Sequence, residues 1–125
     1  MLISLLAWSN IIISTKNIGI DIEKQREKIT RIADKFIGSE VDFLQKDIDY
    51  IEQLSVVWGA KESLYKMCNS RSLSFKQDMH VQNFSLNNGT GNALVDCKEL
   101  DFGCKFTFYF DSFDGYTLVY ALESE

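Results

Sequence analysis

The 125-residue sequence has little of what several functional classes need. It contains one histidine, and its three cysteines form no CxxC pair, which disfavours a zinc site built from cysteine and histidine. Acidic residues outnumber basic ones by 18 to 13, for a net charge of −5, whereas a general nucleic-acid binder needs clustered lysine and arginine. An odd number of cysteines suits a reducing cytoplasm better than a disulfide framework. The composition therefore indicates a cytoplasmic protein without a nucleic-acid partner.

The apolar residues 1–13 are the segment that most resembles a signal sequence or membrane span. No lysine or arginine precedes them, residues 8–10 interrupt them, no small-residue cleavage site follows, and the run is too short to cross a bilayer. We therefore interpret them as one or two buried strands, joined by a turn at residues 14–17 to the next strand. A core that begins at residue 2 suggests that an upstream segment is missing.

Residues 18–23 (IGIDIE) are the central motif. Isoleucines alternate with Gly19, Asp21 and Glu23, which is the period of a β-strand with one buried face. Asp21 and Glu23 therefore point the same way, beside a glycine that has no side chain. Two such carboxylates can hold a hard divalent cation such as Mg²⁺. The alternative interpretation is a surface strand with a solvated acidic face.

Helical periodicity follows. The apolar stripe of the first expected helix consists of Ile29, Ile32, Ala33 and Phe36, and its outer side carries the basic residues Lys24, Arg26, Lys28, Arg31 and Lys35. Gly38 favours a helix end. Ser39 is placed to cap a second, short helix, whose outer side is acidic and includes Glu40. These charged runs are explained equally well by solvated faces and by a partner-docking surface.

Residues 51–67 are predicted to form a longer helix, because they contain no proline and a single glycine. Its buried stripe consists of Val56, Ala60, Leu64 and Met67. Trp58, Glu62 and Lys66 recur at intervals of four and share an adjoining face, flanked by Lys61. With Asp21 and Glu23, this helix offers a third carboxylate for a metal and two lysines for phosphate. A simple Glu62–Lys66 ion pair and a core tryptophan are the alternative.

The rest of the chain is β-rich. Strands are expected at 79–86, 93–97, 104–110 and 116–122, with hairpin signals at 87–91 and 114–115. Phe106, Phe108 and Phe110 alternate with smaller or more polar residues and are assigned to the core. Strands, then helices, then an antiparallel meander predict a single α+β domain over residues 1–125, with the sheet packed against two or three helices.

The two motifs together resemble those of a known family. Residues 18–23 followed by residues 58–66 (WGAKESLYK) are similar to (V/I)-G-(V/I)-D-x-E and W-x-x-K-E-x-x-x-K of the 4′-phosphopantetheinyl transferase superfamily, and residues 115–122 resemble its last strand. The resemblance implies a 4′-phosphopantetheinyl transferase-like fold. It also implies Mg²⁺-dependent transfer of the phosphopantetheine arm from coenzyme A to a serine of an acyl or peptidyl carrier protein, the holo-ACP synthase type of reaction.

The resemblance also assigns residue roles. Asp21, Glu23 and Glu62 match the positions that hold Mg²⁺ with the coenzyme's pyrophosphate. Glu62, or a water that it holds, is the candidate base for the serine proton. Lys66 matches the lysine that contacts phosphate and assists the leaving 3′,5′-ADP. Lys61 matches the other motif lysine and is expected to bind the coenzyme.

Two further expectations concern the surroundings of these residues. Trp58 is assigned to structural support of the helix. The basic helix at 24–35 is predicted to dock an acidic carrier protein.

The chain departs from the family pattern at one end. It resembles only the second repeat of the longer, two-repeat members, and their S-H-S-like motif would fall near Ser4, where no histidine stands. The short members build the site between identical subunits, so we expect an active homodimer or homotrimer. Two alternatives stay open: a half-site protein that binds carrier protein or coenzyme A without turnover, and an oligomeric structural domain whose carboxylates are merely solvated.

Overall fold

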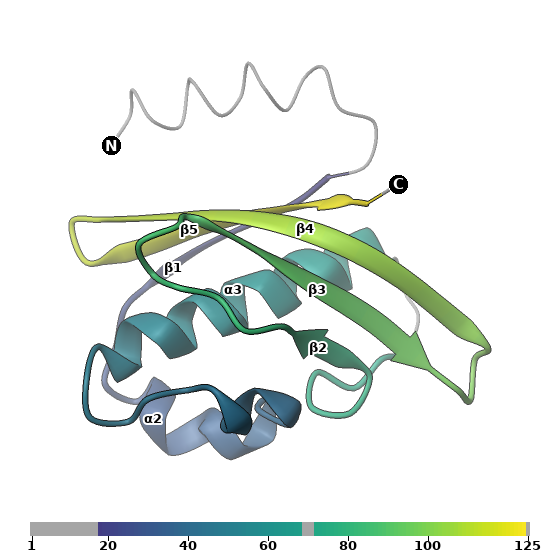
Figure 1. The fold of residues 1–125 in the computed structure, drawn as a ribbon, viewed down its shortest axis with the longest axis horizontal. Helices are drawn as coiled ribbons and strands as arrows, with labels where there is room; N and C mark the ends of the chain where they lie inside the picture. Colours follow the sequence, from purple (N-terminus) through teal and green to yellow (C-terminus); the bar gives the residue numbers. More distant parts are fainter. Residues whose placement is uncertain (1–17, 69–71, 125) are drawn as a thin grey trace.

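The computed structural model describes residues 18–68 and 72–124, so the strands and turn predicted within 1–17 and the loop at 69–71 lie outside the described residues. Within them, one antiparallel sheet has the order β1-β5-β4-β3-β2 (Figure 1). Its strands are β1 (Ile18–Lys24), β2 (Met79–Val81), β3 (Thr90–Cys97), β4 (Phe102–Phe113) and β5 (Tyr116–Glu123). The α+β class with an antiparallel sheet is confirmed.

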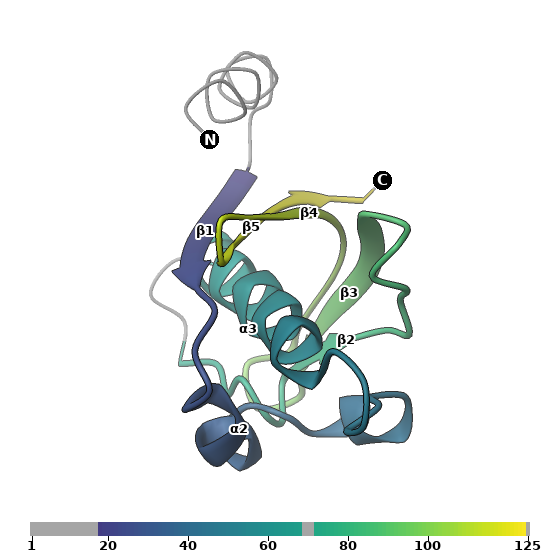
Figure 2. The same cartoon turned by 90° about the vertical axis from the view of Figure 1, so that its left-hand side faces the viewer.

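The long helix α3 (Tyr50–Met67) packs on one face of this sheet. Figure 2 shows the sheet curving around α3, with the short helix α2 (Ile29–Ile32) on the far side of α3 from the sheet. Two 3₁₀ turns, η1 (Ala33–Lys35) and η2 (Ser39–Asp42), complete the helical layer. The prediction for residues 51–67 is therefore confirmed within one residue.

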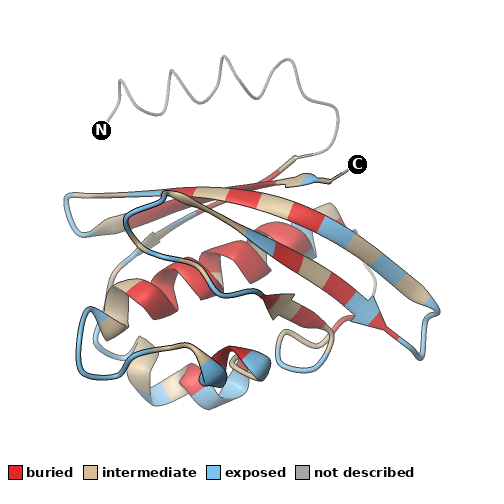
Figure 3. Ribbon diagram, viewed as in Figure 1, coloured by how far each residue is buried: buried red, intermediate tan, exposed pale blue. Residues whose placement is uncertain are grey.

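The core lies between α3 and the inner face of the sheet (Figure 3). The predicted stripe is confirmed, since Val56, Ala60 and Leu64 are fully buried, although Met67 is only partly so. Alternation along β4 buries the three predicted phenylalanines against the helix, at positions 106, 108 and 110. Strands β2, β3 and β4 thus contribute alternate residues to one core, whereas residues 117–121 of β5 are all buried.

The first strand has the predicted alternation, but its buried side is the one that carries Gly19 and Asp21. Ile22, by contrast, is 42% exposed. The reason is the close approach of α3: a Cβ at position 19 would overlap the backbone carbonyl of Ser63, so only glycine fits there. The isoleucines consequently lie on the opposite face of the sheet, and the Asp21 side chain is buried between β1 and α3.

The β4–β5 connection is a two-residue hairpin, as predicted. Phe113 pairs with Tyr116, and Asp114 and Gly115 both have positive φ values of 50° and 77°. Positive φ at both central residues is the type I′ arrangement that matches strand twist. The strand predicted at 79–86 is shorter, since β2 ends at Val81.

Residues 25–42 form short helical turns in place of the two helices predicted, and Lys24 belongs to β1. Ala33 and Phe36 are buried as expected, but α2 gives way to 3₁₀ geometry after one turn. The N-cap of η2 is Gly38 and not the predicted Ser39; the Ser39 hydroxyl lies instead 3.1 Å from His80 Nδ1. Glu40 is fully buried, so its assignment to an acidic exterior is wrong.

Candidate functional site

The C-terminal part of α3 lies against β1, and this contact brings predicted site residues together. Lys66, in the last turn of α3, donates a hydrogen bond to the backbone carbonyl of Ile20 (2.8 Å), and its ammonium lies 3.4 Å from Asp21 Oδ1. Glu62 stands one turn earlier on α3, and Glu23 follows Asp21 on the same face of β1. Three carboxylates and one lysine therefore gather at this strand–helix junction.

Asp21 is the most buried of these groups. Its side chain is 5% exposed, and its Oδ2 atom has no hydrogen-bond partner among the described residues. Burial and, next, the charge of Glu23 raise the pKa of Asp21 from 3.8 to about 7, with a smaller upward effect from Glu62, although Lys66 lowers it. A buried carboxylate with an unpaired oxygen is costly, and a bound cation would remove that cost.

Glu62 is half-buried and belongs to the same electrostatic group. Burial raises the pKa of Glu62, Lys66 lowers it, and the charge of Glu23 raises it. A carboxyl with a raised pKa holds a proton more readily, which suits a general base. The mutual effects show that the three carboxylates repel one another across the junction.

The donor set fits a magnesium ion better than a closed protein cage. In residues 18–68 and 72–124, no three histidine, cysteine or acidic side chains converge closely enough to form such a cage. Mg²⁺ uses hard oxygen ligands, retains several waters, and is usually held by one or two carboxylates together with substrate phosphates. The unpaired Oδ2 of Asp21 is an oxygen of that kind.

Lys61 lies elsewhere, and its position argues against the predicted coenzyme contact. Its side chain is fully buried, and its ammonium donates to the carbonyls of Phe36 (2.6 Å) and Phe75 (2.8 Å) and to Glu40 Oε1 (2.9 Å). A lysine ammonium has three protons, so all of its donors are used. Glu40 also accepts from the Val81 amide (2.7 Å), which makes this pair a structural junction.

This buried pair was missed by the sequence reasoning, although one signal was present. Lys61 follows Val57 by four residues and precedes Leu64 by three, so it falls on the apolar side of the helix. A lysine at such a position is buried only when it is paired. Its partner Glu40 could not be recognised, because it comes from a turn 21 residues away.

A pocket of about 240 Å³ adjoins Glu23. Trp58 lines it and also packs against Phe36 and Phe75, at ring-centroid distances of 5.1 and 5.3 Å, which is the supporting role assigned to it. The remaining lining consists of three basic residues, two isoleucines and one serine: Lys24, Arg26, Lys28, Ile29, Ile32 and Ser55. The basic surface predicted from the sequence therefore borders the carboxylate junction.

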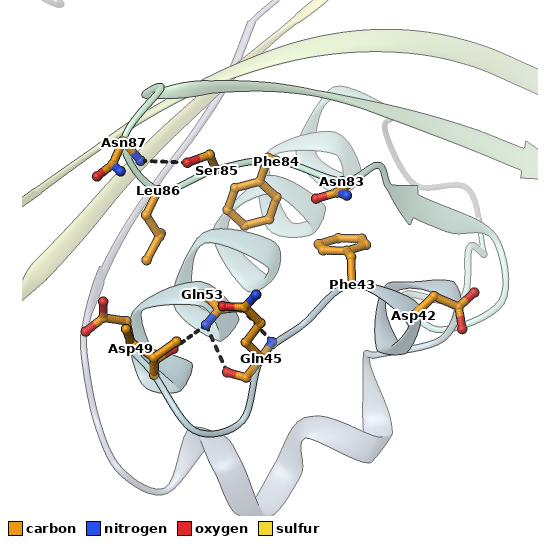
Figure 4. Close-up of a pocket in the computed structure, with 11 residues that line it drawn as sticks. Asp42, Phe43, Gln45, Asp49, Gln53, Asn83, Phe84, Ser85, Leu86 and Asn87 are labelled. Carbon is orange, nitrogen blue, oxygen red and sulfur yellow. Dashed lines mark hydrogen bonds between the residues drawn. The ribbon is translucent and has the colours of Figure 1, made fainter.

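A larger pocket, of about 430 Å³, lies at the opposite end of α3 between the loops that follow η2 and β2 (Figure 4). Phe43 and Phe84 meet edge to face inside it, and Gln53 is bonded to the backbone of Gln45. None of the predicted site residues lines this pocket. We therefore do not assign this pocket to the carboxylate junction.

In the described part of the chain, no helix is both long and apolar enough to cross a membrane. Comparison with curated protein sequences finds no significant match. A family profile, by contrast, covers most of the chain: the 4′-phosphopantetheinyl transferase superfamily matches residues 17–121. This match includes both β1 and α3, the two elements that form the junction. The chain therefore belongs to the 4′-phosphopantetheinyl transferase superfamily, whose activity is the transfer of phosphopantetheine groups.

Proposed function

We propose that this protein transfers 4′-phosphopantetheine from coenzyme A to a serine of an acyl or peptidyl carrier protein, in a Mg²⁺-dependent reaction of the holo-ACP synthase type. The observation that carries the proposal is the junction of β1 and α3. There the buried Oδ2 of Asp21 has no hydrogen-bond partner among the described residues, and the charges of Glu23, Glu62 and Lys66 act on the same carboxyl group. The family membership supplies the class of reaction.

Each residue of the junction has a role in this proposal. Asp21, Glu23 and Glu62 would hold Mg²⁺ together with waters and the coenzyme's pyrophosphate, since the three carboxylates do not form a closed cage by themselves. The bound ion would neutralise phosphate charge. Glu62, directly or through a water, accepts the proton of the carrier serine. The serine oxygen forms a bond to the phosphorus that bears pantetheine, and the bond from that phosphorus to the bridging oxygen of the pyrophosphate breaks. Lys66 contacts the phosphate and offsets the charge of the departing 3′,5′-ADP.

The carrier protein would approach from the basic side of the junction. Arg26 and Lys28 are exposed at the rim of the pocket that adjoins Glu23, and Trp58 supplies an apolar wall. An acidic carrier would be steered to this surface and its serine brought near Glu62. We further propose that the protein works as a homodimer or homotrimer in which the coenzyme site lies between copies of the chain.

The test is mass spectrometry of an apo carrier protein incubated with this protein, coenzyme A and Mg²⁺. We expect a gain of one phosphopantetheine group that is lost with a chelator and reduced by roughly 100-fold or more in Glu62→Gln, as for removal of a general base. Glu99→Gln, the same change at an exposed residue of the β3–β4 turn, is the control and should retain the activity. A folded protein that binds coenzyme A but transfers nothing would contradict the proposal and favour a half-site binding protein.

A further inference from the structure

The contacts of Lys66 are unusual for an exposed side chain. Its side chain is 52% exposed, yet its ammonium turns back to the Ile20 carbonyl (2.8 Å) and to Asp21 Oδ1 (3.4 Å). A surface lysine gains little from an exposed partner, because water and salt screen the pair. Here the partner is a 5% exposed carboxylate, so the ammonium reaches over β1 to a buried negative charge.

We propose that Lys66 is an exchangeable cation: its ammonium compensates Asp21 when no divalent ion is bound, and a divalent ion at the carboxylates displaces it into solvent. This inference rests on the proposed function, since it uses the same magnesium site. The displaced ammonium then becomes free to meet the coenzyme phosphate. Metal binding would therefore precede the contact between Lys66 and the coenzyme phosphate, because the metal releases the Lys66 ammonium.

Electrostatics make the two cations competitors for Asp21. A divalent ion on this carboxylate would lie within a few ångströms of the ammonium, where like charges repel strongly at a partly buried site. The lysine stem is flexible and already half in solvent, so the ammonium can leave with little structural cost. Asp21 has no such freedom, because β1 and α3 enclose it.

The first experiment uses the unaltered full chain and Mg²⁺ alone, without coenzyme. Each lysine is labelled with a limiting amount of acetic anhydride, with and without Mg²⁺, and quantified by peptide mass spectrometry. Exchange predicts that Mg²⁺ raises acetylation of Lys66 severalfold, because its ammonium leaves its two acceptors. The exposed Lys24 and Lys28 are internal controls and should stay unchanged. Constant or reduced acetylation of Lys66 when Mg²⁺ binds would overturn the exchange.

The second experiment measures divalent-ion affinity from the free-ion electron paramagnetic resonance signal of Mn²⁺, at one pH and without coenzyme. Lys66→Gln should bind Mn²⁺ on the order of tenfold more tightly than the unaltered protein, because the competing charge is gone. Lys24→Gln removes the same charge from the exposed side of β1 and should change the affinity by less than roughly twofold.

The outcomes separate the two proposals. Equal Mn²⁺ affinity in the unaltered protein and Lys66→Gln, with detectable binding in both, would overturn the exchange and leave the metal site in place. Absence of binding in both would overturn the metal site and the exchange together. If Lys66→Gln does not fold, the acetylation experiment decides the question, since it needs no variant.

Discussion

The buried pair of Lys61 and Glu40 permits a quantitative prediction of stability. Replacing Lys61 by methionine keeps the apolar stem but removes the ammonium. A fully buried carboxylate is then left without its counter-ion, and the carbonyls of Phe36 and Phe75 lose a donor. Removing one partner of a buried pair costs about 3–5 kcal/mol. For a chain of this size, a loss of 4 kcal/mol lowers Tm by roughly 12–20 °C.

The assay is urea unfolding followed by circular dichroism, on Lys61→Met, Glu40→Gln and the double variant. The double variant should be more stable than the sum of the single losses predicts, by at least about 1 kcal/mol, because each single change leaves the other partner uncompensated. Glu40→Gln keeps an acceptor for the Val81 amide and is therefore expected to cost less than Lys61→Met.

The pH dependence of Glu40→Gln provides a second check. Burial lowers the pKa of Lys61 below 10.5, and Glu40 opposes that shift, so loss of the Glu40 charge lowers the pKa of Lys61 further. The folded state then binds fewer protons than the unfolded state, and stability rises with pH up to about 10.5. The loss caused by Glu40→Gln should therefore shrink between pH 7 and pH 9.5.

One result would refute this reasoning. If Lys61→Met lost less than about 1 kcal/mol of unfolding free energy yet no longer bound coenzyme A, Lys61 would be a coenzyme ligand and not a structural residue. Thermal unfolding and coenzyme titration on the same sample decide between the two roles.

Three further predictions concern the junction and its surroundings. Asp21→Asn should stabilise the metal-free protein by about 2 kcal/mol above pH 7, where the buried Asp21 is charged in the unaltered protein. Because burial raises the pKa of Asp21 from 3.8 to about 7, this gain should decline as the pH falls from about 7 to 3.8, as measured by urea unfolding. Gly19→Ala should destabilise the fold by about 2–3 kcal/mol, since its methyl group meets the helix backbone, as measured by Tm. Arg26→Glu with Lys28→Glu should raise KM for the carrier protein roughly tenfold at low salt and leave KM for coenzyme A unchanged, as measured by initial rates.

Matched controls exist for the last two. Gly103→Ala places a Cβ 3.7 Å from the Val95 carbonyl, an ordinary contact, and should be neutral within about 0.5 kcal/mol. Lys98→Glu reverses a charge in the β3–β4 turn and should leave KM for the carrier protein unaltered. Equal effects in the control and the tested variant would contradict the respective prediction, and a loss of stability in Asp21→Asn above pH 7 would contradict the first.

Local patterns were sufficient to predict most of the secondary structure. The period of two in β1 and β4 and the turn residues Asp114 and Gly115 each depend on neighbours in the sequence. The 18-residue helix α3 is long and free of proline, so its extent was predicted within one residue. The two helices predicted after β1 were wrong in length, because the conformation of such short segments depends on what they pack against.

The sequence by itself determined the family, the class of the fold and which carboxylates share a strand or helix face, because motif order and periodicity are properties of the chain. Only the tertiary structure decided which face of β1 is buried, since both faces carry a period of two and the close approach of α3 at Gly19 selects between them. The tertiary structure likewise decided that Lys61 is buried and Lys66 is exposed. Because Lys66 follows Lys61 by five residues, the two side chains leave α3 in different directions. The Lys61 ammonium enters the core and pairs with Glu40, whereas the Lys66 ammonium stays at the surface beside Asp21.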